Sequence, residues 1–467
     1  MISQIVKKEM KEILRDGRFK ISFLIVVFLL VMALFITSGQ YKSVNEQYEN
    51  AKKSERVAWE SQGEKNPHSA AHYGNYIFKP KLPLSLLDQG VDKYTGVSIF
   101  LEAHNRNEAQ YSSATDQTAL SRFGHLTPDF ILFFIIPLII ILVGYNSFTK
   151  EIEGKTFYIL KSQGVQGWKL VIGKWFAALI PTLSITTLLF VFAGIILSSI
   201  DGFGFFSWSS FLTLYSVYLI YYLIFTNIVL LISSLSKKSG IALVSCLTFW
   251  VLACFVAPKA ASNIADSKYP YPTSQEFSEM ISEEKKLGLD GHNPWNKESK
   301  LLEEKVLKEY NVSNIRELPF NYYAYRMQRS EEYQAKIYAK HYNKLKDQFN
   351  NQTKVYKSLA FISPFLPARF LSMSIANTDY QSHWNFSDSA EEYRIKTQAF
   401  LNGQTEKNSK IGERYIASAD TWKKLPKFTY TPQPLFERLG QNKFNFIILA
   451  FWFLITGGGL LLFNKNY

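Results

Sequence analysis

Six long apolar blocks constrain this chain of 467 residues more than any other feature of its sequence. None of them contains Asp, Glu, Lys or Arg. A helix needs about 20 residues to cross the hydrocarbon core, and a helix satisfies its own backbone hydrogen bonds in lipid. We therefore predict an α-helical polytopic membrane protein with six transmembrane helices, at residues 21–38, 130–148, 175–200, 205–233, 239–258 and 444–463.

Basic residues beside these blocks predict the orientation. Lys and Arg number six, five, two and one in the segments on one side, which are 1–20, 149–174, 234–238 and 464–467. The short loop on the other side, 201–204, holds none. Because cytoplasmic segments carry the excess of basic residues, we expect both termini to be cytoplasmic. Much of the net charge of +13 is explained in this way, so we expect no nucleic-acid partner.

Two long connections remain, 39–129 after the first span and 259–443 after the fifth. This topology makes both of them extracytoplasmic insertions, which we expect to be mostly helical. Within the second connection, residues 358–376 are apolar enough to suggest a seventh span. Two prolines and Arg369 argue against a span, so we predict that this segment rests on the membrane surface.

The N-terminal segment 1–20 has the pattern of an amphipathic interfacial helix. Apolar residues recur on one face, and such a helix lies in the headgroup layer with its basic face toward phosphates. Alternatively, this charged segment only marks the end of the first span, and both interpretations can hold. The basic face consists of Lys7, Lys8, Lys11, Arg15 and Arg18.

Segment 149–174 joins the second and third predicted spans and is rich in Lys and Glu. A charged helical loop in this position is where a motor subunit could push on a membrane subunit. We predict that it couples to an ATPase through Glu151, Glu153, Lys155, Thr156 and Lys161.

The tripeptide 154–156 (GKT) is not a phosphate-binding loop, because that motif needs a glycine five positions earlier, where Thr149 stands. The chain contains no other nucleotide-binding or catalytic motif. We therefore expect no enzymatic activity and no cofactor in this chain.

The fourth predicted span carries tyrosines at helical spacing, with an asparagine further along. A substrate path is one interpretation. A contact with another helix or with lipid is the more common explanation. The residues concerned are Tyr215, Tyr218, Tyr222 and Asn227.

All seven histidines lie in the two long connections. His68 and His72 are four residues apart and could share a helix face toward a metal, with His104 as a third ligand. Hydrogen-bonding roles in a packed domain are the more common fate of such residues. We therefore do not predict a metal site. Should one exist, these three histidines are its candidate ligands.

The order of these features resembles the permease subunit of a bacterial type-2 ABC transporter. The stretch 7–20 (KKEMKEILRDGRFK) resembles the entry helix before the first span, and 150–174 resembles the coupling region. That region usually has a Glu, then Gly-Thr, then Gly-Lys, and the matching residues are Glu153, Thr156, Gly173 and Lys174. Lys155 stands where the family favours Gly.

Motifs in the two insertions resemble a subgroup known mainly as a domain of unknown function. They are NPHSAAHYGNYIFKP (66–80), YTGVSIFLEAHNRN (94–107) and the run from SP to EEYR (363–394). These motifs are more specific than the pattern of spans, and the likeness extends over nearly the whole chain.

The resemblance implies a multi-pass, exporter-like permease of the bacterial cytoplasmic (inner) membrane. It implies two ATP-binding subunits that hold ATP and Mg²⁺, and a second permease, identical or homologous. It implies no particular substrate or direction of transport. An alternative is a membrane-anchored periplasmic scaffold, or a metal-handling protein, that matures a periplasmic partner.

Overall fold

The computed structural model of the chain describes residues 1–112, 126–200 and 203–463. Six helices in these ranges are long and apolar enough to cross a membrane, as predicted. The described residues are mostly helical. The only sheet that they form has two antiparallel strands. Residues 113–125 of the first connection, 201–202 of the short loop and 464–467 lie outside the description.

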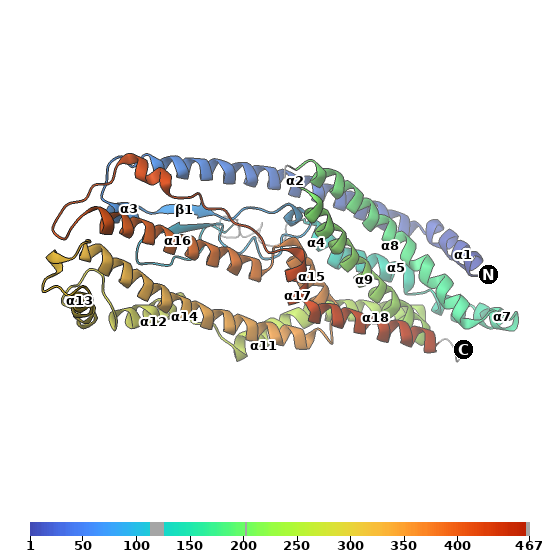
Figure 1. Cartoon of the computed structure of the whole chain (residues 1–467). Helices are drawn as coiled ribbons and strands as arrows, with labels where there is room; N and C mark the ends of the chain where they lie inside the picture. Colours follow the sequence, from blue (N-terminus) through green and yellow to red (C-terminus); the bar gives the residue numbers. More distant parts are fainter. Residues whose placement is uncertain (113–125, 201–202, 464–467) are drawn as a thin grey trace.

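The six spans gather at the end of the molecule that carries both termini (Figure 1). We call them the span bundle, and α9 packs against α5, α8 and α18 within it. Two spans are interrupted by π-helical turns, labelled η. The bundle consists of α2 (Gly17–Glu60), α4–η3–α5 (Pro128–Phe130, Ile131–Ile135, Ile136–Gly144), α8 (Gly167–Ser198), α9 (Phe205–Leu235), α10–η4–α11 (Ser239–Val251, Leu252–Val256, Ala257–Lys268) and α18 (Lys443–Phe463).

Each π-helical turn is followed directly by a helix that has a proline in its first turn. Pro137 has no N–H, so the carbonyls about one turn earlier lose their helical partner. The hydroxyl of Tyr221 donates to the Phe133 carbonyl at 3.1 Å, and that of Tyr222 donates to the Leu132 carbonyl at 3.0 Å. Two tyrosines of α9 therefore satisfy the backbone that Pro137 exposes in an apolar interior.

The segment predicted to rest on the membrane surface is instead packed inside the protein. Its helix α15 (Phe365–Ala376) is largely buried against α9 and α18. Arg369 lies 2.7 Å from both carboxylate oxygens of Asp88 and 3.1 Å from Asp129. These two acidic residues of the first connection compensate the charge that argued for a surface position, and they let α15 close the end of the bundle.

The rest of both long connections folds into one elongated region, which we call the distal body. Helix α16 contacts α14 of its own connection, and also α3 and β2 of the first connection. Asn75 pairs with Leu101 at one end of the β1–β2 ladder. The distal body consists of α3 (Pro67–Tyr73), β1 (Asn75–Phe78), η1 (Pro83–Leu86), β2 (Ser98–Leu101), α12 (Ser274–Lys286), α13 (Lys297–Tyr310), η5 (Ile315–Glu317), α14 (Tyr322–Leu359), α16 (Tyr380–Asn408) and η6 (Ala419–Lys424).

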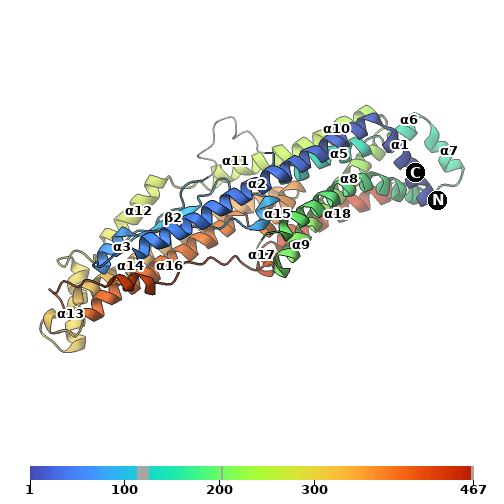
Figure 2. The same cartoon turned by 90° about the horizontal axis from the view of Figure 1, so that it is seen from above.

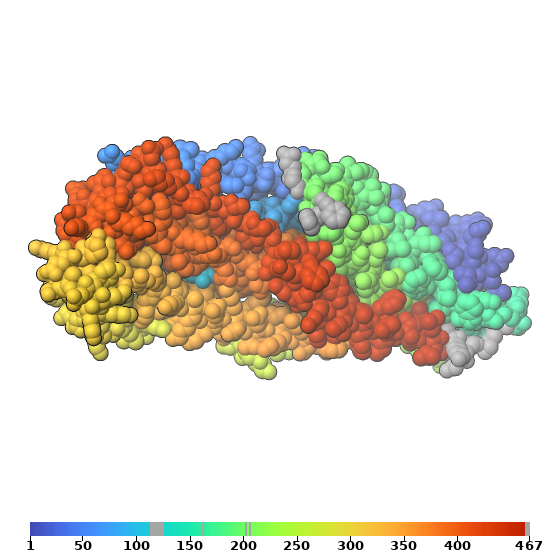
Figure 3. Space-filling view, in the orientation of Figure 1, coloured from blue at the N-terminus to red at the C-terminus, as the bar shows by residue number. Residues whose placement is uncertain are grey.

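Several contacts join the distal body to the span bundle, among them the packing of α11 on α14. The long helix α2 extends from the bundle along the distal body, where the indole N–H of Trp59 donates to the Trp422 carbonyl at 3.1 Å. The orange and red surface of the second connection continues from the distal body onto the bundle, where α17 (Leu435–Gln441) precedes α18 (Figure 3).

Candidate functional site

One end of the molecule carries the segments predicted to receive a partner. These are α1 (Ile2–Arg15), α6 (Thr149–Glu153), α7 (Thr156–Ser162) and the start of α8. Figure 2 shows α1, α6 and α7 together beside the N- and C-termini. We call this region the charged end.

A buried ion cluster joins three helices at the charged end. The Lys174 side chain of α8 is only 1% exposed. Its Nζ lies 2.8 Å from Glu9 of α1 and 3.0 Å from Glu151 of α6, and it donates to the Ser147 carbonyl at 2.6 Å. Lys8 lies 3.2 Å from the same Glu151 oxygen. A buried lysine without such partners would be strongly unfavourable, so these contacts fix α1, α6 and α8 together.

Gly173 explains how closely α1 approaches α8. A Cβ atom at this position would lie 2.6 Å from the Cγ2 of Ile5. No side chain fits at that distance, so the apolar face of α1 packs directly on the backbone of α8. The Gly-Lys pair in the ABC-permease resemblance therefore has a physical role: Gly173 admits α1, and Lys174 anchors it.

Two of the residues predicted to contact an ATPase have partners within the chain, Glu151 in the interior and Glu153 at the surface. Glu151 is buried in the ion cluster, so its carboxylate is not available to a partner. Glu153 accepts hydrogen bonds from the backbone N–H and the hydroxyl of Ser239, at 2.9 and 2.7 Å. It therefore caps the start of α10. The sequence shows the charge of both residues but not these partners, and Glu153 remains exposed at the surface.

The turn that leads into α7 is exposed. Lys155 is exposed and has a φ of 58°, the left-handed conformation that glycine adopts most readily. This is the position at which the resembled family favours Gly. Thr156 begins α7, in which Tyr158 and Ile159 are 66% and 54% exposed. Lys161 also belongs to α7, but its side chain lies outside the described part of the structure.

The basic residues of the N-terminal segment lie on its exposed side. Two of them are also paired: Lys8 with the ion cluster, and Arg18 with Asp16 at 2.8 Å. Lys150 of α6 lies 2.7 Å from Glu12 and adds a second link to α1. The exposed set is Lys7, Lys8, Lys11, Arg15 and Arg18.

The tyrosine stripe of α9 lies mostly within the bundle. Tyr218 is fully buried and its hydroxyl lies 3.0 Å from that of Ser372 in α15. Asn227 accepts a hydrogen bond from the indole N–H of Trp175 at 2.8 Å. These contacts give the stripe a role in helix packing; its predicted members are Tyr215, Tyr218, Tyr222 and Asn227.

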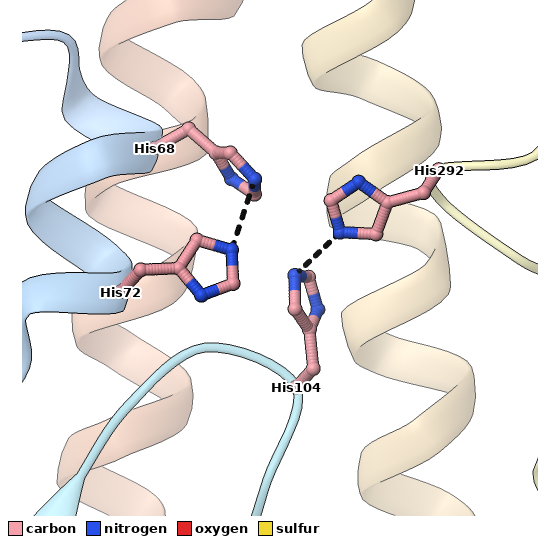
Figure 4. A group of neighbouring side chains, drawn as sticks. All are labelled: His68, His72, His104 and His292. Carbon is pink, nitrogen blue, oxygen red and sulfur yellow. Dashed lines mark hydrogen bonds between the residues drawn. The ribbon is translucent and has the colours of Figure 1, made fainter.

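In the distal body, the three candidate metal-ligating histidines come together with a fourth. His68 and His72 are on α3, His104 follows β2, and His292 lies in the loop between α12 and α13 (Figure 4). One potential ligand nitrogen from each ring lies within 4.8 Å of all the others. Two Nε2 pairs are closest, at 3.2 Å for His68–His72 and 2.9 Å for His104–His292.

Sequence reasoning did not select His292. It lies 188 residues after His104, and only the packing of the two connections brings them together. The spacing of His68 and His72 is a local signal that could be read, whereas no local pattern marks His292.

Charged residues surround one side of this cluster. The Nδ1 of His104 lies 2.6 Å from Glu331, whose other oxygen lies 3.1 Å from Arg394. Burial alone would raise the pKa of Glu331, but the contacts with His104 and Arg394 lower it to about 2. Burial and the neighbouring histidines lower the pKa of His68 to about 4. At neutral pH, Glu331 is therefore ionised and His68 is neutral.

Part of the chain matches a known protein family. Residues 275–431, about a third of the chain, match a family model described as a domain of unknown function (DUF3526). The matched segment includes His292, Glu331 and Arg394. No curated protein matches the chain. The match and the six apolar helices together fit a multi-pass membrane protein.

Proposed function

We propose that this chain is the permease subunit of an ATP-driven, exporter-like transporter of the type-2 ABC class. In this proposal the charged end faces the cytoplasm and the distal body lies outside the bacterial inner membrane. Two ATPase subunits bind ATP and Mg²⁺, and a second permease, identical or homologous, completes the complex.

The main support for this proposal is the set of contacts that attach the charged end to the span bundle. Lys174 ties α1 and α6 to the span helix α8, and Glu153 ties α6 to the start of the span helix α10. A force applied to α6 and α7 therefore reaches two membrane-spanning helices through short, specific contacts. A passive membrane anchor has no need for such an arrangement.

The exposed apolar residues of α7 are the proposed contact with the ATPase. Tyr158 and Ile159 lie in a charged connection between spans, outside the apolar blocks themselves. Apolar and aromatic anchors surrounded by polar residues are typical of protein interfaces. Lys155, exposed at the adjoining turn, lies within the polar surroundings.

Co-purification tests this proposal. The tagged full-length protein is purified in mild detergent from its native host, and we expect a stoichiometric ATP-binding subunit to accompany it. Charged substitutions in α7, Tyr158→Asp with Ile159→Asp, should abolish the co-purification by removing the apolar contact.

A matched control is Leu287→Asp, because Leu287 is 82% exposed and lies in the distal body. This variant should retain the ATPase. The proposal fails if the wild-type protein brings down no ATP-binding subunit, or if the α7 double variant retains it in full.

A further inference from the structure

We propose that four histidines of the distal body bind one late first-row divalent transition-metal ion, such as Zn²⁺ or Cu²⁺. The ligands are His68, His72, His104 and His292. This site goes beyond the proposed transport function and does not depend on an ATPase partner.

The ring nitrogens lie near the spacing that one metal ion imposes, although the wider pairs, up to 4.8 Å apart, must move closer together. A tetrahedral ion with metal–nitrogen bonds of about 2.0–2.1 Å holds its ligand nitrogens about 3.4 Å apart. The two closest Nε2 pairs, at 3.2 and 2.9 Å, need to separate by only a few tenths of an ångström. All four rings direct a nitrogen toward a common centre (Figure 4).

The donor set selects the class of metal. Mg²⁺ and Ca²⁺ prefer oxygen ligands, and this group of four contains imidazole nitrogens alone. Imidazole suits Zn²⁺, Cu²⁺ and Ni²⁺. Four protein ligands fill a tetrahedral shell, which is typical of a site that holds the ion rather than one that activates a bound water.

The residues around His104 support a ligand role for its ring. A carboxylate 2.6 Å from Nδ1 favours the tautomer with its proton on Nδ1, which leaves the Nε2 lone pair for the metal. The backbone N–H of His104 also donates to Glu331, at 2.9 Å. His104 has a φ of 66°, an uncommon left-handed conformation for a non-glycine residue. Glu331 therefore holds both the backbone and the ring of His104 in place.

The segments that carry the other ligands are also held by local hydrogen bonds. The side chain of Asn66 accepts a hydrogen bond from the His68 N–H at 2.9 Å and caps α3, which carries His72 one turn later. The carboxylate of Asp290 accepts a hydrogen bond from the His292 N–H at 2.8 Å. Three separate pieces of chain thus present their imidazoles before any ion binds, as pre-organised sites do.

The alternative is that the rings only hydrogen-bond to each other in two pairs. That arrangement satisfies four nitrogens, but it does not require the two pairs to lie side by side. A metal ion requires all four together, and it would also link the two connections. His72 and His292 are exposed, so both can be changed with little disturbance of the core.

The test uses the full-length protein in detergent, stripped with a chelator and then titrated with Zn²⁺, Cu²⁺ or Co²⁺. We expect one ion per chain by elemental analysis, and the visible absorption of four-coordinate Co²⁺. The double variant His72→Gln with His292→Gln should bind at least about 100-fold more weakly. Glu331→Gln should retain the site but weaken it by about 10–100-fold.

His383→Gln is the control, because this histidine of the distal body contacts Tyr380 and lies outside the cluster. It should bind as the wild type does. Failure of every tested ion to bind at a one-to-one ratio would overturn the proposal, as would equal binding by the double variant. If the double variant does not fold, His292→Gln alone decides: a Co²⁺ spectrum identical to that of the wild type would overturn the assignment.

Discussion

At the scale of single residues, the charged end depends on a buried lysine. Lys174 has two glutamates and a backbone carbonyl as partners, and Lys8 shares both of those glutamates. Two lysines and two glutamates therefore balance one another where helices α1, α6 and α8 meet. Removing Lys174 would leave the buried Glu9 and Glu151 with only the half-exposed Lys8 as a cationic partner.

The variant Lys174→Met tests this role. It removes the positive charge while keeping much of the side-chain volume, so Glu9 and Glu151 would lose their principal partner. We expect a loss of about 3–5 kcal/mol in the free energy of unfolding, measured by denaturation in detergent. The triple variant with Glu9→Gln and Glu151→Gln should recover most of that loss. Equal losses in the single and the triple variant would contradict the ion-cluster interpretation.

At the scale of elements, the close packing of α1 on α8 depends on Gly173. Gly173→Leu would drive a side chain into Ile5 and release α1 from the bundle. We expect faster tryptic cleavage within α1, at Lys7 and Lys11, in limited proteolysis. The control is Gly240→Leu, because a Cβ atom at Gly240 meets nothing within 4 Å. Equal cleavage of the two variants would show that this contact does not hold α1.

The sequence predicted some elements well because their cause is local. The six spans follow from long runs of apolar side chains, a property that needs no tertiary information. The π-helical turn before Pro137 was not predicted, and the tyrosine hydroxyls that satisfy its carbonyls come from more than 80 residues away. The position of α15 was predicted wrongly, because Asp88, which neutralises Arg369, lies 281 residues away.

The candidate site shows the same limit. Glu151 and Glu153 are conspicuous in sequence as charges of a loop, yet their partners Lys174 and Ser239 are visible only in the fold. Three of the four clustered histidines could be chosen from sequence. His292 could not, because it reaches the cluster only through the packing of the two long connections.

At the scale of the whole molecule, helices α1 and α7 of the charged end lie far from α3, which carries His68 and His72, along the elongated structure (Figure 1). Helix α2 and the second connection link the bundle to the distal body. We therefore propose different environments for the two regions: a cytoplasmic end that receives force and an extracytoplasmic body that holds a metal ion. In this proposal the two regions lie on opposite sides of one membrane.

Site-directed labelling tests whether the two regions lie on opposite sides of the membrane. Both natural cysteines are buried in the fifth span and can be replaced by serine, so single cysteines can be placed at Lys155 and Leu287. A membrane-impermeant maleimide is then added to intact bacterial spheroplasts and to lysed ones. We expect Leu287→Cys to be labelled in intact spheroplasts and Lys155→Cys to be labelled only after lysis. Labelling of both positions from the same side, or the reverse pattern, would contradict this proposal.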